Sequence, residues 1–258
     1  MRILMVGDIV GRPGRRALRE TIGGIRQELK LDMIIANGEN AAGGNGITGA
    51  IAQDIFSFGV DVLTMGNHVW DKKDFASYID REPRIIRPAN YPPGTPGTGM
   101  VIYNINGVDV GVINLSGRVF LPDLDCPFRT VDRLIEEIKK RTNIILIDFH
   151  AEATSEKAAL GWYVDGRATA VVGTHTHVQT ADERVLPNGT AYITDLGMTG
   201  PVNSIIGVKP DLALQKFITQ MPVRFEVAEG PYQFNAVVIE ADEKTGKAET
   251  IERVINLE

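Results

Sequence analysis

Short apolar runs alternate with segments of helical periodicity through the first third of the chain. Three runs are almost unbroken in apolar residues, as is typical of strands buried on both faces, and they lie at 2–6, 33–36 and 61–65. Between them, one helix is predicted from Pro13, which suits a first helical turn, to about Lys30. A second is predicted from Thr48, a suitable N-cap, to about Phe58. This alternation predicts parallel crossover units.

The rest of the chain adds antiparallel signals. Asn106-Gly107 lies between two strand-like runs, which is the strongest short hairpin signal. Further strands are predicted at 143–148, 169–172, 232–240 and 247–254, a short hairpin around 187–190, and helices at 131–140, 155–163 and 209–218. No linker or repeat interrupts the pattern, so we predict one domain over 1–258. Parallel and antiparallel strands together predict an α/β fold with a mixed sheet or two stacked sheets, covered by helices.

Composition and charge exclude several classes of protein. No apolar run reaches the roughly 18 residues that a membrane helix needs, and the N-terminus turns polar too early for a signal peptide. We therefore expect a cytoplasmic protein without a membrane partner. Cys126 is the only cysteine, which excludes an internal disulfide and a thiolate zinc cluster. The net charge of -6 argues against stable binding of long nucleic acid, although not against a small phosphorylated ligand.

Polar side chains gather where the predicted strands end. All four histidines of the chain lie at such ends, and carboxylate and amide residues follow other strands in the same way. The set consists of Asp8, Glu39, Asn40, Asn67, His68, His150, His175 and His177. Ligands of α/β sheets bind outside the carboxyl ends of the strands, so we expect these side chains to converge. Oxygen and imidazole ligands suit hard or borderline divalent metals.

This pattern predicts a two-metal hydrolase centre, in which Glu39 or Asp8 could bridge the ions. His175 and His177 would point to opposite sides of an extended segment. In a loop they could reach two different metals, or one metal by a side chain and a turn. Each residue alone has an ordinary explanation, since Asp8 could cap the next helix and Asn67 could satisfy a turn. The joint placement favours the metal interpretation.

The order of these motifs resembles the calcineurin-like metallophosphoesterase superfamily. The motifs are G7-D8, G38-E39-N40, G66-N67-H68, H150 and G173-T174-H175-T176-H177. Three positions depart from the common pattern: Val10 replaces a histidine, Glu39 an aspartate and Val69 an acidic residue. These departures, the stretch G161-W162-Y163-V164-D165-G166-R167 and the chain length resemble the YmdB-like subfamily over essentially the whole chain.

The resemblance implies a fold and a set of roles. The fold would be an α-β-β-α sandwich of mixed sheets covered by helices. One metal would be held by Asp8, Asn40 and His177, the other by Asn67, His150 and His175, with Glu39 bridging. His68 would be the general acid or a phosphate contact. Because Val69 cannot orient it, Asp71 is a nearby substitute.

The activity implied by the resemblance is hydrolysis of small phosphodiesters by metal-activated hydroxide, with 2′,3′-cyclic nucleotides as the expected substrates. The expected cofactors are two divalent ions per chain, with iron as first choice and manganese or zinc as alternatives. Two other functions remain open: a non-catalytic or slow nucleotide sensor or scaffold, and a phosphomonoesterase, including a protein phosphatase. A homo-oligomer is the default expectation.

Two weaker signals lie near the first motifs. Arg12, Arg15 and Arg16 at the start of a predicted helix oppose the helix dipole, so an anion such as substrate phosphate would explain them. Solvated surface arginines are an equally good interpretation. The sequence G44-N45-G46-I47-T48-G49 matches a dinucleotide fingerprint, but it lies too far from its strand to act as one.

Overall fold

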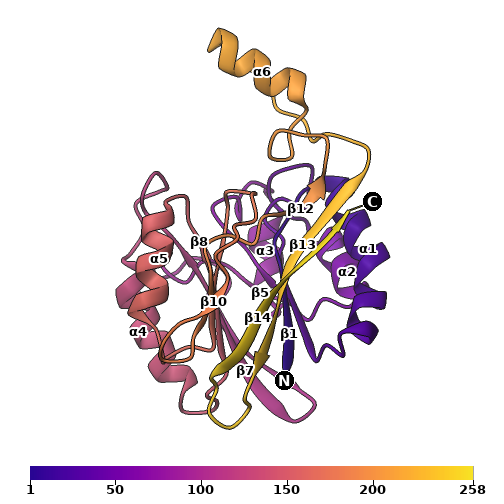
Figure 1. The fold of residues 1–258 in the computed structure, drawn as a ribbon. Coiled ribbons are helices and arrows are strands. Elements are labelled where there is room, and N and C mark those ends of the chain that lie inside the picture. Colours follow the sequence, from indigo (N-terminus) through magenta and orange to yellow (C-terminus); the bar gives the residue numbers. More distant parts are fainter. Residues whose placement is uncertain (258) are drawn as a thin grey trace.

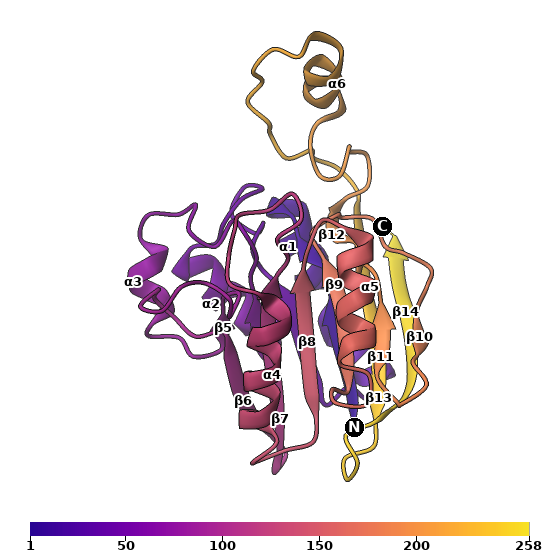
Figure 2. The same cartoon turned by 90° about the vertical axis from the view of Figure 1, so that its left-hand side faces the viewer.

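Two β-sheets lie face to face, with helices on both outer faces, in the computed structural model, which describes residues 1–257 (Figures 1 and 2). The eight-stranded sheet has the order β2-β12-β13-β1-β3-β4-β5, with β14 beside β13, and the six-stranded sheet has the order β10-β11-β9-β8-β7-β6. This α-β-β-α arrangement confirms the predicted fold class.

The elements have the following bounds. The strands are β1 Arg2–Val6, β2 Asp8–Ile9, β3 Met33–Asn37, β4 Val62–Thr64, β5 Ile85–Ile86, β6 Met100–Ile105, β7 Val108–Ser116, β8 Ile145–His150, β9 Ala170–Thr174, β10 Arg184–Val185, β11 Ala191–Ile193, β12 Met198–Pro201, β13 Tyr232–Ala241 and β14 Ala248–Leu257. The helices are α1 Gly11–Glu28, α2 Gly49–Ser57, α3 Phe75–Ile79, α4 Pro127–Ile138, α5 Thr154–Tyr163 and α6 Pro210–Thr219.

Alternate residues of each central strand serve two different cores, which explains the unbroken apolar runs. In β1, Ile3 and Met5 pack into the core between the sheets, whereas Leu4 and Val6 pack into the core beneath α1 and α2. A third core lies beneath α4 and α5, where Ile147 packs. Because strand side chains alternate with period two, a strand between two cores must be apolar at every position.

Most predicted elements are confirmed, and the exceptions are short. β2 lies between the predicted strand at 2–6 and the helix predicted from Pro13, where no strand was predicted, and its residues Asp8 and Ile9 pair in parallel with β12. β5, β12 and α3 were not predicted either, since segments of two to five residues carry too little periodicity to be recognised. α1 begins at Gly11 rather than at Pro13.

The first and last strands of the chain share one sheet. β1 pairs with β13 in antiparallel register from Arg2 opposite Glu240 to Val6 opposite Ala236, and the last strand, β14, also pairs with β13. This pairing supports the prediction of one domain over 1–258, which stays a prediction and of which residue 258 lies outside the described part. Within residues 1–257, no helix is long and apolar enough to cross a membrane.

One part of the chain stands away from the sandwich. We call residues 202–230 the arm; it consists of α6 and its flanking segments, and both views show α6 beyond the ends of the strands (Figures 1 and 2). Large apolar side chains of the arm face solvent, among them Phe217, which is 71% exposed, and Ile218, which is 79% exposed.

Candidate metal centre

The predicted ligands meet at the carboxyl ends of parallel strands from both sheets. β3 and β4 are parallel neighbours in one sheet, and β8 and β9 are parallel neighbours in the other. Asp8 begins β2, Glu39 and Asn40 follow β3, Asn67 and His68 follow β4, His150 ends β8, and His175 and His177 follow β9. Residues that are up to 169 positions apart in the sequence are thereby brought to one edge of the sandwich.

The centre of the cluster is the Nε2 atom of His150. Glu39 Oε1, Asn67 Oδ1 and His175 Nδ1 each lie 3.0 Å from it. Candidate ligand atoms of Glu39, His150 and His175 all lie within 4.8 Å of one another. Such a convergence of oxygen and imidazole donors is the arrangement that a divalent cation requires.

Hydrogen bonding beneath this cluster determines the tautomer of His150. The Thr174 hydroxyl donates to Asp148 Oδ1 at 2.7 Å, and His150 Nδ1 lies 2.9 Å from the same hydroxyl oxygen. Because the hydroxyl has only one hydrogen, it must accept from Nδ1–H of His150. The Nε2 atom of His150 therefore points toward the cluster, where it can bind a metal once it has lost its proton.

Four buried polar residues, Asn37, Thr64, Asp148 and Thr174, form what we call the floor of the centre. Asp148 Oδ2 accepts from Thr64 Oγ1 at 2.5 Å and from Asn37 Nδ2 at 3.0 Å. Burial raises the pKa of Asp148. These four residues were not predicted from the sequence, although polar residues in otherwise apolar strands were the available signal.

A second group of donors surrounds Asp8. This carboxylate is fully buried, and its Oδ1 atom has no hydrogen-bond partner among residues 1–257, although His177 Nε2 lies 3.9 Å away. His177 donates from Nδ1 to the Ile206 carbonyl at 2.8 Å, which leaves the Nε2 lone pair facing Asp8 and the Asn40 amide, 3.1 Å away. An unpartnered buried carboxylate oxygen facing an imidazole lone pair fits a cation between them.

The electrostatics of the cluster also favour a cation. Burial opposes the charge of His150, but the carboxylates of Glu39, Asp8 and Asp148 outweigh burial and raise its pKa to about 9. Burial likewise opposes ionisation of Glu39, yet mainly the attraction of His150 lowers its pKa to about 2. Burial raises the pKa of Asp8 to about 6. For His175, burial and then the neighbouring His150 lower the pKa to about 4.

A strained loop sends its two histidines in different directions. His175 and His177 both have left-handed backbones, with φ of 100° and 67°. His175 faces His150, whereas His177 faces Asn40, so the loop serves both groups of donors. Asp195 holds the residue between them, accepting from the backbone N of Thr176 at 3.1 Å and from its hydroxyl at 2.7 Å. Lys157 Nζ balances this buried carboxylate at 2.6 Å.

His68 lies at the rim of the centre with the partner that the sequence suggested. Its Nδ1 atom is 2.9 Å from Asp71 Oδ2, and its backbone N donates to Glu39 Oε2 at 3.0 Å. Gly66 lets this loop approach the ligands, because a Cβ there would lie 2.2 Å from Glu39 Oε2 and 2.4 Å from His150 Nε2. The Gly-Asn-His motif thus needs its glycine for space.

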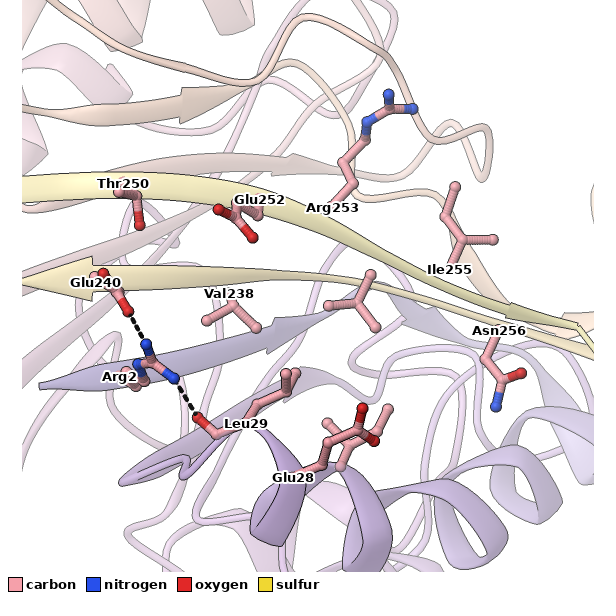
Figure 3. A pocket seen from close by; sticks show the side chains of 12 residues that line it. Arg2, Glu28, Leu29, Val238, Glu240, Thr250, Glu252, Arg253, Ile255 and Asn256 are labelled. Carbon is pink, nitrogen blue, oxygen red and sulfur yellow. Dashed lines mark hydrogen bonds and ion pairs between the residues drawn. The ribbon is translucent and has the colours of Figure 1, made fainter.

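A cavity of about 340 Å³ opens above the cluster and is lined by Glu39, Asn40, His68, His175 and His177 among others. Glu152, which was not predicted from the sequence, also lines this cavity, and its Oε2 atom lies 3.1 Å from His175 Nε2. Its signal was its position two residues after His150. A cavity of about 570 Å³ between α1 and the strands β13 and β14 contains none of the candidate ligands (Figure 3). There Arg2 pairs with Glu240 and donates to the Leu29 carbonyl.

The three N-terminal arginines do not line the cavity above the cluster. Arg15 donates to the Ala41 carbonyl. Arg12 and Arg16 line a neighbouring cavity of about 330 Å³. Val227 lines both this cavity and the one above the cluster. Their binding of substrate phosphate stays a prediction.

Comparisons with known proteins agree with this geometry. A sequence profile of the family described as YmdB-like protein matches residues 4–254. A 2′,3′-cyclic-nucleotide 2′-phosphodiesterase of Bacillus subtilis (strain 168) is 55% identical over 255 residues, which cover 99% of this chain and 97% of that protein. A crystal structure of a hypothetical protein from Thermus thermophilus has a TM-score of 0.94 and 42% identity, with all of both chains covered.

A crystal structure described as a novel phosphatase from Mycoplasma pneumoniae also has a TM-score of 0.94, with 33% identity over 100% of this chain and 93% of that one. The similarity therefore extends over both sheets and all the candidate ligands rather than over one motif. The chain belongs to the YmdB-like family, within the calcineurin-like metallophosphoesterases.

Proposed function

We propose that this protein is a metal-dependent phosphodiesterase that hydrolyses nucleoside 2′,3′-cyclic phosphates to 3′-phosphates. Membership of the family implies divalent metal ions, and the cluster of Glu39, His150 and His175 is a candidate site for them. The observation that carries the proposal is the convergence of three ligand atoms on His150 Nε2, with His68 and Asp71 beside them. The activity named for the 55% identical relative supports the substrate class.

Two ions would share the donors found here. One would be held by Asp8, Asn40 and His177, the other by Asn67, His150 and His175, and Glu39 would contact both. Oxygen and imidazole donors without a thiolate favour iron, manganese or zinc. When bound, the ions would polarise the phosphoryl oxygens and lower the pKa of the attacking water.

The residues of the chain account for the proton that the reaction requires. The oxygen of a water molecule forms a bond to phosphorus, and the bond from phosphorus to the ribose 2′ oxygen breaks. Protonated His68 donates its proton to that departing oxygen, giving a 2′-hydroxyl and a 3′-phosphomonoester. The water releases one proton to solvent, and His68 regains a proton from solvent after each turnover. Asp71 accepts from Nδ1 of His68, which orients the ring and leaves Nε2 for the leaving group. No covalent phosphoenzyme is needed.

The proposal is tested by comparing substrates that differ in their leaving group. His68→Ala should lower kcat for 2′,3′-cyclic AMP by about 10²–10⁴-fold, the usual contribution of a general acid. It should lower kcat much less for bis(p-nitrophenyl) phosphate, whose leaving group needs no proton. Asp74→Asn, an exposed substitution in the same loop, is the matched control and should change neither rate. Equal losses on both substrates would contradict the role of His68.

Side-by-side assays distinguish the other functions. If metal-loaded protein hydrolysed no phosphodiester or monoester but bound nucleotide, it would be a sensor or scaffold. If it preferred monoesters such as phosphopeptides, it would be a phosphatase. Cytoplasmic location, homo-oligomer formation and the lack of long nucleic-acid binding stay predictions.

A further inference from the structure

The cavity above the metal centre has one polar wall and one apolar wall. Four of the candidate ligands form the polar wall together with His68 and Glu152, namely Glu39, Asn40, His175 and His177. The apolar wall consists of Val10, Ile206, Val208, Phe225 and Val227. Four of these five residues belong to the arm. Phe225 is 51% exposed and Ile206 is 52% exposed, although both border the cavity. Exposed apolar side chains beside a reactive centre are characteristic of a ligand site.

The arm holds this wall in a defined position relative to the metal centre. The segments before and after α6 are bridged, with Val208 opposite Val227 and the backbone N of Lys209 donating to the Glu226 carbonyl at 3.0 Å. The part of the arm nearest the sandwich is attached to the metal centre, because His177 donates from Nδ1 to the Ile206 carbonyl. Ile206 keeps a left-handed backbone there, with φ of 46°, which is unfavourable for a β-branched residue.

We propose that the apolar wall binds the base of the nucleotide substrate, and that the ring of Phe225 stacks on it. This inference rests on the proposed function, because it assigns a binding surface to the base, which is the other end of the same substrate. A nucleoside cyclic phosphate has an anionic end and a flat, largely apolar end, which match the two walls. The cavity of about 340 Å³ lies within the range of small-molecule sites.

The chemistry of the wall also defines its selectivity. Its five side chains are aliphatic or phenyl groups, which offer no hydrogen-bond donor or acceptor to the edge of a base. Stacking on an aromatic ring tolerates every base, since each has a π-face. The protein should therefore accept purine and pyrimidine 2′,3′-cyclic phosphates, with a preference for the larger purine surface.

Phe225→Ala tests the inference on two substrates, 2′,3′-cyclic AMP and methyl β-riboside 2′,3′-cyclic phosphate, which carries a methyl group in place of the base. The variant should lower kcat/KM for the nucleotide by at least about fivefold, from the usual contribution of base stacking, and leave the riboside unchanged. Phe225→Tyr should restore the nucleotide rate. Phe217→Ala, on the exposed surface of α6, is the matched control and should change neither rate.

Three outcomes would overturn the inference: equal losses on both substrates, no loss on either, or an equal effect of Phe217→Ala. Failure of the proposed function is a separate result, in which the native protein cleaves neither ester. The dissociation constant of adenosine 3′-phosphate from the metal-loaded protein then reports how strongly the apolar wall binds the base, without any need for catalysis. Phe225→Ala should weaken that binding by a similar factor, and unchanged binding would reject the stacking role.

Discussion

The floor and the arm both contact the candidate metal centre, but they are built in opposite ways. All four floor residues are at most 1% exposed, and their side chains bond to one another or to His150. The arm exposes large apolar side chains, among them Met221 at 62%. Breaking a buried polar network leaves unpaired groups, whereas substitution at an exposed position costs little. Metal geometry should therefore depend on the floor and substrate selection on the arm.

The largest effect should come from removing the charge of Glu39, whose carboxylate lies 3.0 Å from His150 Nε2. Glu39→Gln should weaken metal binding more than about 100-fold, because even residues behind a ligand commonly contribute 10–100-fold. Elemental analysis should find two ions per native chain and fewer in the variant. Glu28→Gln, an exposed substitution on α1, is the control. Retention of two ions in Glu39→Gln would remove Glu39 from the centre.

A smaller effect should follow from altering the floor while keeping every ligand. Thr174→Val preserves shape but removes the hydroxyl that accepts from His150, so metal affinity should fall about 10–100-fold. Thr174→Ser retains the hydroxyl and should bind metal nearly as the native protein does. Titration calorimetry with Mn²⁺ measures both variants. If valine and serine gave the same affinity, the floor would not orient His150.

The stability of the metal-free protein and that of the metal-loaded protein should depend differently on pH, because a proton and a metal compete for His150. The pKa of folded His150 is about 9 against 6.5 for the free group, so its contribution to stability is complete below pH 6.5 and is lost as pH rises through 9. Metal requires the same Nε2 without a proton, so metal affinity rises over that range.

The difference in Tm between manganese-loaded and chelator-treated protein should therefore widen as pH rises from 6.5 toward 9. Thermal scans across this range measure the difference. A Tm difference that stays constant or narrows would mean that His150 does not exchange a proton for metal.

The smallest effect is expected at the tip of the arm. Ile218→Ser should change the free energy of unfolding by less than about 0.5 kcal/mol, because the side chain is 79% exposed. Urea titration of the metal-loaded protein measures this change. A loss of more than about 1 kcal/mol would show that α6 is packed against something in solution, and the contrast between arm and floor would fail.

Local patterns were sufficient for most of the fold. The apolar runs that became β1, β3 and β8 were recognisable because both faces of each strand are buried, and Asn106-Gly107 marked the hairpin of β6 and β7. The two-residue β2 was not recognisable, because its pairing with β12 involves residues about 190 positions away. Such a strand exists only through its partner.

In the candidate metal centre, too, some features could be predicted from local patterns and others depend on distant parts of the chain. Positions at strand ends identified Asp8, Glu39 and the four histidines, since parallel strands bring their carboxyl ends to one edge. The direction of each ring was not readable, because it depends on the left-handed backbone at His175 and His177 and on hydrogen bonds from distant segments.

By itself, the sequence determined most of the elements, an α/β fold with parallel and antiparallel strands and the set of candidate ligands, because these follow from residue types and periods that repeat within a few turns of chain. Tertiary structure alone decided that Thr174 and Asp148 orient His150 and that the arm places Phe225 beside the cavity. These contacts join side chains through space, and their formation depends on sheet order and backbone direction, which no local pattern encodes.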